Sequence, residues 1–337
     1  MKKYAESGVN IKKEQKTVEA LIEIFNEKSY LPGIFAKYFY LRNTALGFSC
    51  DGVGSKILCY QKKGDFHGLA WDLVAMNAND LASEFIKPRF LIDYLAFNKP
   101  SPEIAKEIGK DLKKACKFAG IKLAGGETAS LPDQIKNGTF DWAAVAIGSE
   151  KKSLHEILIK RRESLKPGYI ILGIPSSGIH SNGLTLARKL YENKLIKPDE
   201  IIPGSEKTLI EELTTPTKIY SPLMEKIKDL VEAFVHITGG GYRNLLRVLP
   251  QGVFADLRIS KKVPIFELIK EKLKVPESEM FEVFNMGYGM VIVIKKENLD
   301  ELRERIEKGG EECDEIGILK KGRKKIVVNK KIVFRKY

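Results

Sequence analysis

The sequence predicts an α/β (α+β) protein of two domains. Strand and helix patterns alternate along the chain, and no repeat or low-complexity linker interrupts them. The 337 residues, of which 43% are hydrophobic, are enough for more than one core. Four widely spaced cysteines exclude a disulfide framework. No run approaches the roughly 18 apolar residues of a membrane span, and the first residues lack a signal-peptide core, so we expect a cytoplasmic protein with no membrane partner.

Strands are predicted where β-branched or aromatic residues cluster between Gly, Pro or Asn. Six segments fit this description: 45–50, 90–97, 140–148, 169–175, 231–237 and 289–294. A shorter strand at 121–124 ends on residues 125–128, Gly-Gly-Glu-Thr. Several of these strands therefore lead into glycine-rich turns.

The clearest helix is predicted at 101–119. Ser101 can cap its N-terminus, Pro102 suits the first helical position, and Gly120 can end it. Residues 71–81 predict a second helix that is buried, because seven of its eleven side chains are apolar.

The charged stretch 150–166, just before Pro167-Gly168, is the predicted domain boundary. It divides the chain into an N-terminal ATP-binding and dimerisation domain, 1–160, and a C-terminal α/β domain, 166–337. The ATP and dimer assignments depend on the resemblance described below.

The formal net charge of +13 is concentrated at the C-terminal end. Residues 317–337 hold nine of the 57 Lys and Arg residues and no acid. Their alternation of β-branched residues with lysines predicts an edge hairpin that is dispensable for chemistry. An RNA-binding tail is the alternative, but no aromatic stacking platform accompanies it. We therefore expect no nucleic-acid partner.

Residues 51–56, Asp-Gly-Val-Gly-Ser-Lys, follow an apolar strand and predict a phosphate loop. Its glycines allow close backbone approach and Lys56 supplies a compact positive charge. The spacing differs from a Walker A motif. Asp51 could bind Mg²⁺ while Lys56 contacts a phosphate. A hairpin turn with an incidental lysine is the alternative.

Two acids, Asp72 and Asp80, lie on the predicted buried helix, where each needs a partner or a metal. Eight residues separate them by roughly 12 Å along the helix and about 80° around it, so one ion cannot easily bind both. One ligand from this helix, with Asp51 and Glu127 from strand ends, is the more economical Mg²⁺ site. The alternative is that these acids cap helices or pair with lysines.

Two glycine-rich turns predict anion sites. Residues 176–183, Ser-Ser-Gly-Ile-His-Ser-Asn-Gly, precede a helix at 184–193, and residues 238–241, Thr-Gly-Gly-Gly, precede one at 242–248. His180 and His236 accompany them, and either can be catalytic or a structural donor.

Together these segments resemble the phosphoribosylformylglycinamidine cyclo-ligase (aminoimidazole ribonucleotide synthetase) family over nearly the whole chain. The resemblance rests on seven motifs in order: residues 4–11, 51–56, 72–81, 125–129, 176–183, 236–241 and 284–290. One departure concerns residues 31–36, Leu-Pro-Gly-Ile-Phe-Ala, where the family has a longer glycine-rich segment.

The resemblance implies a two-domain fold of the cyclo-ligase/synthetase superfamily. Its N-terminal strands build a barrel across a homodimer interface, and ATP binds near that interface. The implied reaction is ATP-dependent closure of formylglycinamidine ribonucleotide to 5-aminoimidazole ribonucleotide through an iminophosphate, giving ADP and phosphate. Phosphoryl transfer of this kind needs positioning and charge neutralisation rather than a protein nucleophile.

The candidate site residues follow from the motifs and the resemblance together. Catalytic roles are expected for His180, Lys56 and Asp80, and Mg²⁺ is expected at Asp51, Asp80 and Glu127. Contacts with ATP are expected from Asp51, Gly52, Gly54, Ser55, Lys56, Gly125, Gly126, Thr128 and Asn182. Contacts with the nucleotide substrate are expected from Ser177, Gly178, His180, His236, Thr238, Gly239, Gly240 and Gly241, the last four as a cradle for its phosphate.

Other members of the same superfamily are the main alternatives. A thiamine monophosphate kinase would not call for the loop at 176–183. Selenophosphate synthetase and a hydrogenase maturation factor would need terminal cysteines that the chain lacks, and the chain is too short for formylglycinamidine synthetase.

Overall fold

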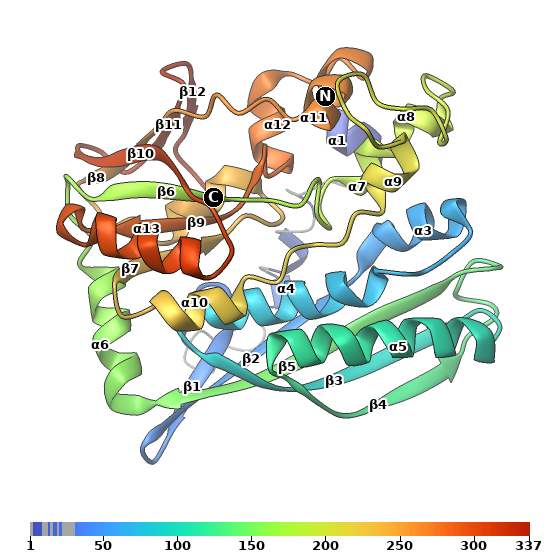
Figure 1. The fold of residues 1–337 in the computed structure, drawn as a ribbon, viewed down its shortest axis with the longest axis horizontal. Coiled ribbons are helices and arrows are strands. Elements are labelled where there is room, and N and C mark those ends of the chain that lie inside the picture. The colour runs from blue at the N-terminus through green and yellow to red at the C-terminus, as the bar shows by residue number, and fades with distance from the viewer. Residues whose placement is uncertain (1–2, 9–12, 14–15, 19, 22–30) are drawn as a thin grey trace.

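Two β-sheets with helices packed against them form the protein (Figure 1). The structure is a computed structural model that describes residues 3–8, 13, 16–18, 20, 21 and 31–337. Residues 9–11 of the motif at 4–11 lie outside the described residues. The short helix α1 (Lys3–Glu6) contacts α7 of the second half of the chain.

The first sheet has five strands in the order β1-β2-β5-β3-β4. β3 and β4 pair in parallel, and the other neighbours are antiparallel. The strands are β1 (Lys37–Leu41), β2 (Thr44–Gly52), β3 (Lys87–Phe97), β4 (Lys122–Ser130) and β5 (Phe140–Lys151).

Helices α4 (Leu69–Ser83) and α5 (Pro102–Ala119) lie over one face of this sheet (Figure 1). α4 is buried along almost its whole length, because the sheet and α5 pack on one side of it while α10 and β7 pack on the other. This central position lets α4 present side chains to both halves of the molecule.

The second sheet has seven strands in the order β12-β11-β8-β10-β6-β9-β7. β11 runs parallel to β8, and the other neighbours are antiparallel. The strands are β6 (Ile170–Pro175), β7 (Val231–His236), β8 (Val253–Leu257), β9 (Tyr288–Ile294), β10 (Asp314–Lys321), β11 (Ile326–Val328) and β12 (Ile332–Phe334).

Shorter helices connect these strands and surround the second sheet. They are α3 (Ile57–Lys63), α7 (Leu184–Ala187), α8 (Lys189–Glu192), α9 (Leu209–Leu213), α10 (Ser221–Ile227), α11 (Pro264–Lys272), α12 (Glu277–Val283) and α13 (Leu299–Lys308). The 3₁₀ helices among the described residues are η2 (Gly54–Lys56), η3 (Gly241–Arg247) and η4 (Lys296–Asn298).

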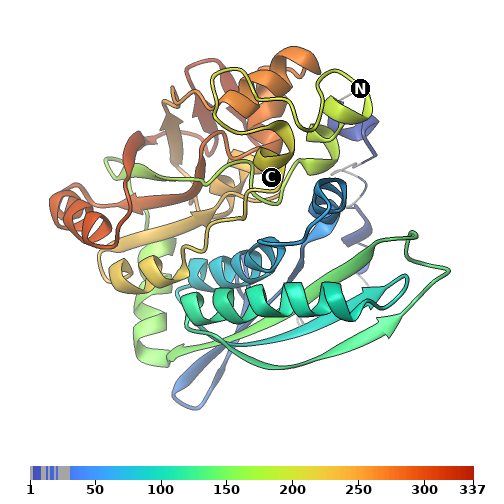
Figure 2. The same cartoon turned by 45° about the vertical axis from the view of Figure 1, so that its right-hand side comes forward.

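Helix α6 (Lys152–Glu163) joins the two halves and runs between them in both views (Figures 1 and 2). It occupies the charged stretch 150–166. Its buried Arg162 forms an ion pair of 2.9 Å with Glu84 at the end of α4, and the ring of His155 contacts the carbonyl of the same residue. The predicted boundary is therefore a helix that is anchored to the first half.

The structure confirms the predicted helices at 101–119 and 71–81 and all six longer strands. Ser101 accepts a hydrogen bond from the N–H of Ile104, and Gly120 ends α5 with a φ of 68°. Local capping signals were sufficient here, because each capping group finds its hydrogen-bond partner within about one turn of the helix.

Three expectations need correction. Residues 125–128 are part of strand β4, because pairing with β3 continues through both glycines. The expected helix at 184–193 consists of two short helices, α7 and α8, and the one at 242–248 is the 3₁₀ helix η3. The C-terminal end is an edge hairpin only at β11 and β12, since β10 lies inside the sheet.

Candidate active site

The loop at 51–56 leaves β2 and is held from α4. The backbone N–H of Asp51 donates to the side chain of Asn77 at 3.0 Å, and Asn77 donates back to the Asp51 carbonyl at 3.1 Å. Gly54 has a φ of 56°, in the left-handed region that favours glycine. Ser55 Oγ lies 2.9 Å from Thr185 Oγ1 in α7. The loop thus sits where the two halves meet.

Lys56 points inward from this loop instead of toward solvent. Its Nζ lies 2.6 Å from Asp72 Oδ1 and 2.6 Å from the carbonyl oxygen of Thr215, and the side chains of Lys56 and Asp72 are fully buried. For Asp72, the alternative that the acids of this helix pair with lysines is therefore confirmed. In this conformation the ammonium is occupied and does not reach a phosphate.

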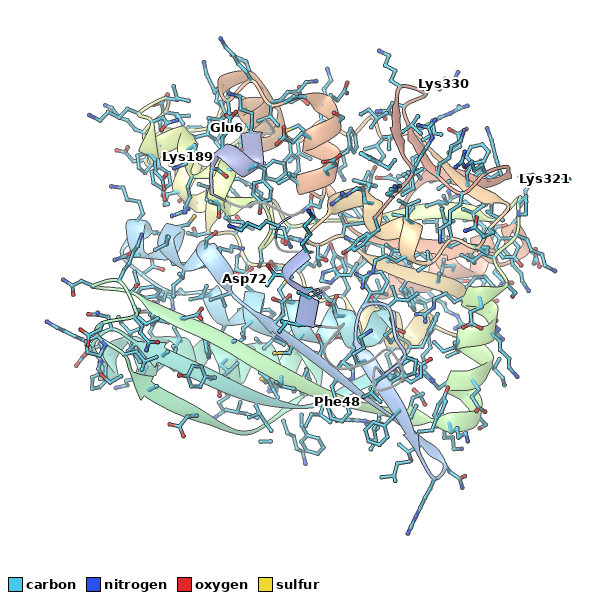
Figure 3. All side chains as sticks on the ribbon, turned by 180° about the vertical axis from the view of Figure 1, so that it is seen from behind. Glu6, Phe48, Asp72, Lys189, Lys321 and Lys330 are labelled. Atoms are coloured by element: carbon cyan, nitrogen blue, oxygen red, sulfur yellow. The ribbon has the colours of Figure 1, made fainter. Side chains whose placement is uncertain are left out.

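Asp72 gathers donors from three segments and lies between the two halves of the molecule (Figure 3). Besides Lys56, its Oδ1 accepts from Ser181 Oγ at 3.0 Å and from the N–H of Thr217 at 2.8 Å. Ser181 belongs to the loop at 176–183. Asp72 therefore ties that loop to α4 and, as a buried and fully partnered carboxylate, offers little to a metal.

Asp80 faces a different partner, as the helix geometry predicts. Its Oδ1 lies 2.7 Å from His236 Nδ1, at the end of β7. Asn79 Oδ1 accepts from the N–H of Tyr220 at 2.7 Å, so its Nδ2 is the group that faces His236 Nε2 at 3.4 Å. This arrangement places the proton of a neutral His236 on Nδ1, from which it donates to Asp80.

Asp51 and Asp80 form a concentration of negative charge. Burial, followed by the charge of Asp80, raises the pKa of Asp51 to about 6, although the N–H of Gly52 donates to it at 2.7 Å. A divalent cation would stabilise a partly buried carboxylate that is repelled by a second one.

Glu127 does not join these two acids within one chain. Asp51 pairs with Ala144 on β5, Ala144 with Asp93 on β3, and Asp93 with Gly126 on β4. Three strand spacings make roughly 14 Å between the ends of this row. In the described part of the chain no group of three His, Cys, Asp or Glu side chains is arranged to hold a metal ion. The expected trio of ligands is therefore not assembled in one chain.

Gly125, Gly126, Glu127 and Thr128 lie on the exposed edge strand β4. A Cβ on Gly126 would stand 2.1 Å from Asp93 Oδ1, so a glycine is required at this position for packing. Two strands, β5 and β3, separate these expected ATP contacts from β2, the strand that leads into the loop at 51–56.

The loop at 176–183 places His180 in the interior with a φ of 62°. The ring is 2% exposed, and its Nε2 accepts from the N–H of Ser177 at 3.2 Å. Burial, together with the charges of Lys56, His236 and Lys218, lowers the pKa of His180 well below its ordinary value. His180 is therefore neutral at physiological pH and carries its proton on Nδ1.

Two donors in this loop lack partners among the described residues. They are Nδ1 of His180 and Nδ2 of Asn182, both shielded from solvent. Buried polar groups are rarely left unsatisfied without a functional reason. An acceptor such as an amide or phosphate oxygen would complete them.

The loop at 238–241 lies next to this one. A Cβ on Gly239 would be 3.5 Å from Asn182 Oδ1, which brings the two loops side by side. Gly241, with a φ of 55°, passes so close to Phe281 that a Cβ would be 2.2 Å from its carbonyl oxygen. The structure thus brings the substrate residues predicted around 176–183, His236 and 238–241 together, with Asp51 and Asp80 beside them.

Sequence reasoning missed several residues that build this site. Three of them, Thr217, Lys218 and Tyr220, come from the segment before α10. Thr217 donates a hydrogen bond to Asp72, and Tyr220 donates one to Asn79. The charge of Lys218 acts on His180 and helps to lower its pKa. Gly289 matters as well, because a Cβ there would be 2.3 Å from the His180 ring and 2.4 Å from Tyr220 Oη. Residues 217–220 carry no local motif, so only the tertiary contacts reveal them.

Two family profiles match the chain. The family described as AIR synthase related protein, N-terminal domain, matches residues 36–149, and AIR synthase related protein, C-terminal domain, matches residues 166–330. No helix among the described residues has the length and apolar character needed to cross a membrane.

Curated relatives match over nearly their full length. The phosphoribosylformylglycinamidine cyclo-ligase of Alkaliphilus metalliredigens is 34% identical, covering 97% of this chain and 98% of the relative. That of Caldanaerobacter subterraneus subsp. tengcongensis is 38% identical, covering 95% and 98%. That of Methanocaldococcus jannaschii is 37% identical, covering 89% and 87%.

Solved structures share the fold at lower identity. AaThiL complexed with AMPPCP and TMP has a TM-score of 0.63 and 16% identity, covering 97% of each chain. Escherichia coli HypE, a hydrogenase maturation protein, has a TM-score of 0.60 and 16% identity, covering 86% of this chain and 84% of that one. HypE in complex with ATP has a TM-score of 0.60 and 15% identity, covering 88% and 86%.

Proposed function

The chain belongs to the phosphoribosylformylglycinamidine cyclo-ligase family and is an ATP-dependent ligase that forms a carbon–nitrogen bond in purine biosynthesis; on this premise we propose how its residues act. The reaction closes formylglycinamidine ribonucleotide to 5-aminoimidazole ribonucleotide and converts ATP to ADP and phosphate. The observation that carries the proposed site is the pair of unpartnered buried donors, His180 Nδ1 and Asn182 Nδ2, in the loop at 176–183.

The chemistry explains why such a site suffices. An amide oxygen is a poor leaving group, so the γ-phosphoryl group of ATP is transferred to it and ADP leaves. The neighbouring amidine nitrogen then attacks the activated carbon, the C–O bond breaks, and phosphate departs with the former amide oxygen. Loss of a proton completes the ring. The protein has to align the reactants and stabilise charge on oxygen, for which fixed donors are effective.

His180 is proposed to donate a hydrogen bond to the reacting amide. Its lowered pKa keeps the ring neutral, so it acts as a fixed donor from Nδ1 and not as an imidazolium acid. The N–H of Ser177 holds the ring in this orientation, and the absence of a side chain at Gly289 leaves room for it. The expected substrate contacts at Ser177, Gly178, His236 and 238–241 surround it.

ATP and Mg²⁺ are proposed at the side of Asp51 and Asp80. Burial and, after it, the nearby charge of Asp80 raise the pKa of Asp51, and a bound cation would offset both effects, so these two residues fit Mg²⁺. The metal would neutralise charge on the phosphates. AaThiL with AMPPCP and HypE with ATP support nucleotide binding by this fold. Lys56 is proposed to act through Asp72 in holding the loop at 51–56.

A homodimer is proposed through the outer face of the five-stranded sheet. This face exposes Phe90, Ile92 and Tyr94 on strand β3, each between 42% and 45% exposed. A contiguous apolar face of this kind marks an interaction site. A second copy covering it would build the expected barrel and would bring Gly125–Thr128 into an interface, where these residues could serve the partner's nucleotide.

We also propose the division into domains 1–160 and 166–337, which is supported by the two sheets and the two profile matches. The substrates of such an enzyme are cytoplasmic nucleotides, and we place the protein there.

The reaction can be tested directly. Purified protein is incubated with ATP, Mg²⁺ and formylglycinamidine ribonucleotide, and aminoimidazole ribonucleotide is assayed by diazotisation. We expect product formation and substrate-dependent ADP release, with no phosphorylation of thiamine monophosphate in a parallel reaction. Phosphorylation of thiamine monophosphate without ring closure would favour the kinase alternative.

A further inference from the structure

The guanidinium of Arg247 contacts two aromatic rings from distant parts of the chain. Its central carbon is 4.8 Å from the ring centroid of Phe35 and 4.9 Å from that of Tyr337. One of its N–H groups donates to the carbonyl of Ile34, and another lies 3.4 Å from Asn244 Oδ1. Both rings are therefore within cation–π distance of the guanidinium, and two of its nitrogens already face an oxygen acceptor.

Phe35 comes from a firmly held segment. Glu84 Oε1 accepts hydrogen bonds of 2.6 Å from the backbone N–H groups of Ile34 and Phe35. Glu84 is fully buried and is paired with Arg162 of α6. The shortened segment at 31–36 thus positions an aromatic ring against Arg247.

Tyr337 connects the C-terminal end of the sequence to the loop at 238–241. A Cβ on Gly240 would be 3.5 Å from Tyr337 Cε2 and 3.6 Å from Arg243 Nη2. The guanidinium carbon of Arg243 lies 5.9 Å from the Tyr337 ring centroid, and its Nε donates to the carbonyl of Gly240 at 3.4 Å. Tyr337, both arginines and the loop form one cluster.

The cluster contains two positively charged side chains, those of Arg243 and Arg247. Among the ion pairs of the described residues, none includes Arg243 or Arg247, whereas Arg162, Arg188 and Arg305 each have a carboxylate. Lys37 is close enough to Arg247 to be affected by its charge. Burial lowers the pKa of Lys37, the charge of Glu84 raises it, and the charge of Arg247 lowers it further. Asn182, whose Nδ2 is unpartnered, lies next to Gly239 through its Oδ1. A dianion would satisfy these groups.

We propose that Arg247, with Arg243, binds the phosphate of the ribonucleotide substrate beside residues 238–241, and that Phe35 and Tyr337 are positioning residues that hold the Arg247 guanidinium for it. The inference rests on the proposed function, which supplies a sugar-phosphate substrate. It gives the last residue of the basic C-terminal segment a role in substrate binding that the edge-hairpin interpretation does not include.

The test measures KM for formylglycinamidine ribonucleotide and for ATP in Arg247→Met, Tyr337→Ala and Tyr337→Phe. Loss of the guanidinium should raise KM for the ribonucleotide about 10- to 100-fold, the range of a lost charge-assisted contact. Tyr337→Ala should raise it about 3- to 10-fold, because one stacking face is lost, and Tyr337→Phe should restore it. KM for ATP and kcat should stay within about twofold in the tyrosine variants.

Lys325→Ala is the matched control, since it removes another cation–π contact, 4.9 Å from the Phe254 ring, on the same sheet. It should leave both KM values unchanged. Circular dichroism checks folding, and Tyr337, which is 45% exposed, can be truncated without opening a core. A normal KM for the ribonucleotide in both Arg247→Met and Tyr337→Ala, or a fall in kcat with KM unchanged, would overturn the proposal.

Binding of ribose 5-phosphate, followed by calorimetry, separates this inference from the proposed function. If the wild type binds this probe and Arg247→Met does not, the phosphate site stands even when no ring closure is observed. If the wild type closes the ring but binding of the probe is equal in both proteins, the proposed function stands and the phosphate site fails.

Discussion

The residues of the site owe their chemical state to burial more than to their intrinsic acidity. His180 and Asp51 move in opposite senses for the same reason, because low polarity disfavours the charged form of each. The pKa of His180 is lowered and that of Asp51 is raised to about 6. One becomes a dependable neutral donor, and the other becomes a carboxylate that gains from a cation.

The first prediction concerns His180. His180→Asn and His180→Ala should lower kcat and kcat/KM by about 10²-fold, because the donor to the developing charge is lost. Nucleotide affinity should change little. His180→Asn is the better variant, since asparagine tolerates the left-handed φ of 62° better than alanine does.

Steady-state kinetics paired with calorimetry decides the role of His180. A lower melting temperature with near-normal kcat would show that the ring only braces the loop. The activity should also show no titration of His180 between pH 6 and 8, because its pKa lies well below this range.

The second prediction concerns Asp51. Its folded pKa of about 6 lies above the ordinary value near 3.9, so the folded state binds this proton more tightly than the unfolded state. Without metal, Asp51 should therefore destabilise the protein progressively as pH rises from about 4 through 6, by at most about 2–3 kcal/mol at pH 7. Asp51→Asn removes this loss and retains an oxygen for the Gly52 N–H.

Urea unfolding of wild type and Asp51→Asn at pH 5 and pH 7 measures the difference. The variant should gain relative stability at pH 7, and added Mg²⁺ should stabilise only the wild type. Parallel pH profiles with no selective effect of Mg²⁺ would contradict both the titration and the metal assignment at Asp51.

The side-chain contacts of the acids on α4 were only partly predictable from the sequence. The sequence indicated that Asp72 and Asp80 needed different partners, and helix geometry was enough for that. The identity of the partners was not accessible, because Thr217 is 145 residues from Asp72 and His236 is 156 residues from Asp80 in the sequence. Lys56 was expected at a phosphate because a lysine after a glycine-rich loop carries no sign of the buried acid that it meets.

At the scale of elements, local signals predicted what local interactions decide. Helix α5 is capped by its own neighbours, and its expected limits hold. β4 runs through two glycines that suggested a turn, because its pairing with β3 is set by tertiary structure. The place of β10 inside the second sheet could not be predicted either, since alternation of apolar and polar residues does not distinguish an inner from an edge strand.

The third prediction follows from the last two strands. β11 and β12 bury four apolar side chains in the second core, Ile326, Val328, Ile332 and Phe334. At about 1.5–3 kcal/mol for each, their removal would cost roughly 6–12 kcal/mol, which is comparable with the whole stability of a domain. A chain ending after Lys321 should therefore fail to fold cooperatively, contrary to the expectation of a dispensable tail.

A chain ending after Lys336 is the matched control, because it keeps both strands and lacks only Tyr337. Thermal unfolding should show a normal cooperative transition for this protein. A cooperative transition in the chain that ends after Lys321 would show that the hairpin contributes little to the second core.

At the scale of the whole molecule, the two halves face each other across α4. Its burial on both sides lets Asp72 hold the loops of the second half while Asp80 contacts His236. Helix α6 braces the same contact through Arg162 and Glu84. The site is thus built at a junction, and neither sheet alone contains it.

The last prediction concerns the exposed face of the five-stranded sheet. If a second copy covers β3 and β4, a charge at the centre of that face should separate the protomers, because an unpaired buried carboxylate is costly in an interface. Ile92→Asp should convert a dimer into a monomer in light scattering coupled to size exclusion. Ile157→Asp, at a side chain that is 51% exposed on α6, is the matched control and should leave the dimer intact. If the expected ATP contacts of Glu127 and Thr128 are made across this interface, turnover should fall with dissociation, because β4 is roughly 14 Å from Asp51 in one chain. A monomeric wild type with full activity would contradict the dimer and would leave β4 without a role in ATP binding.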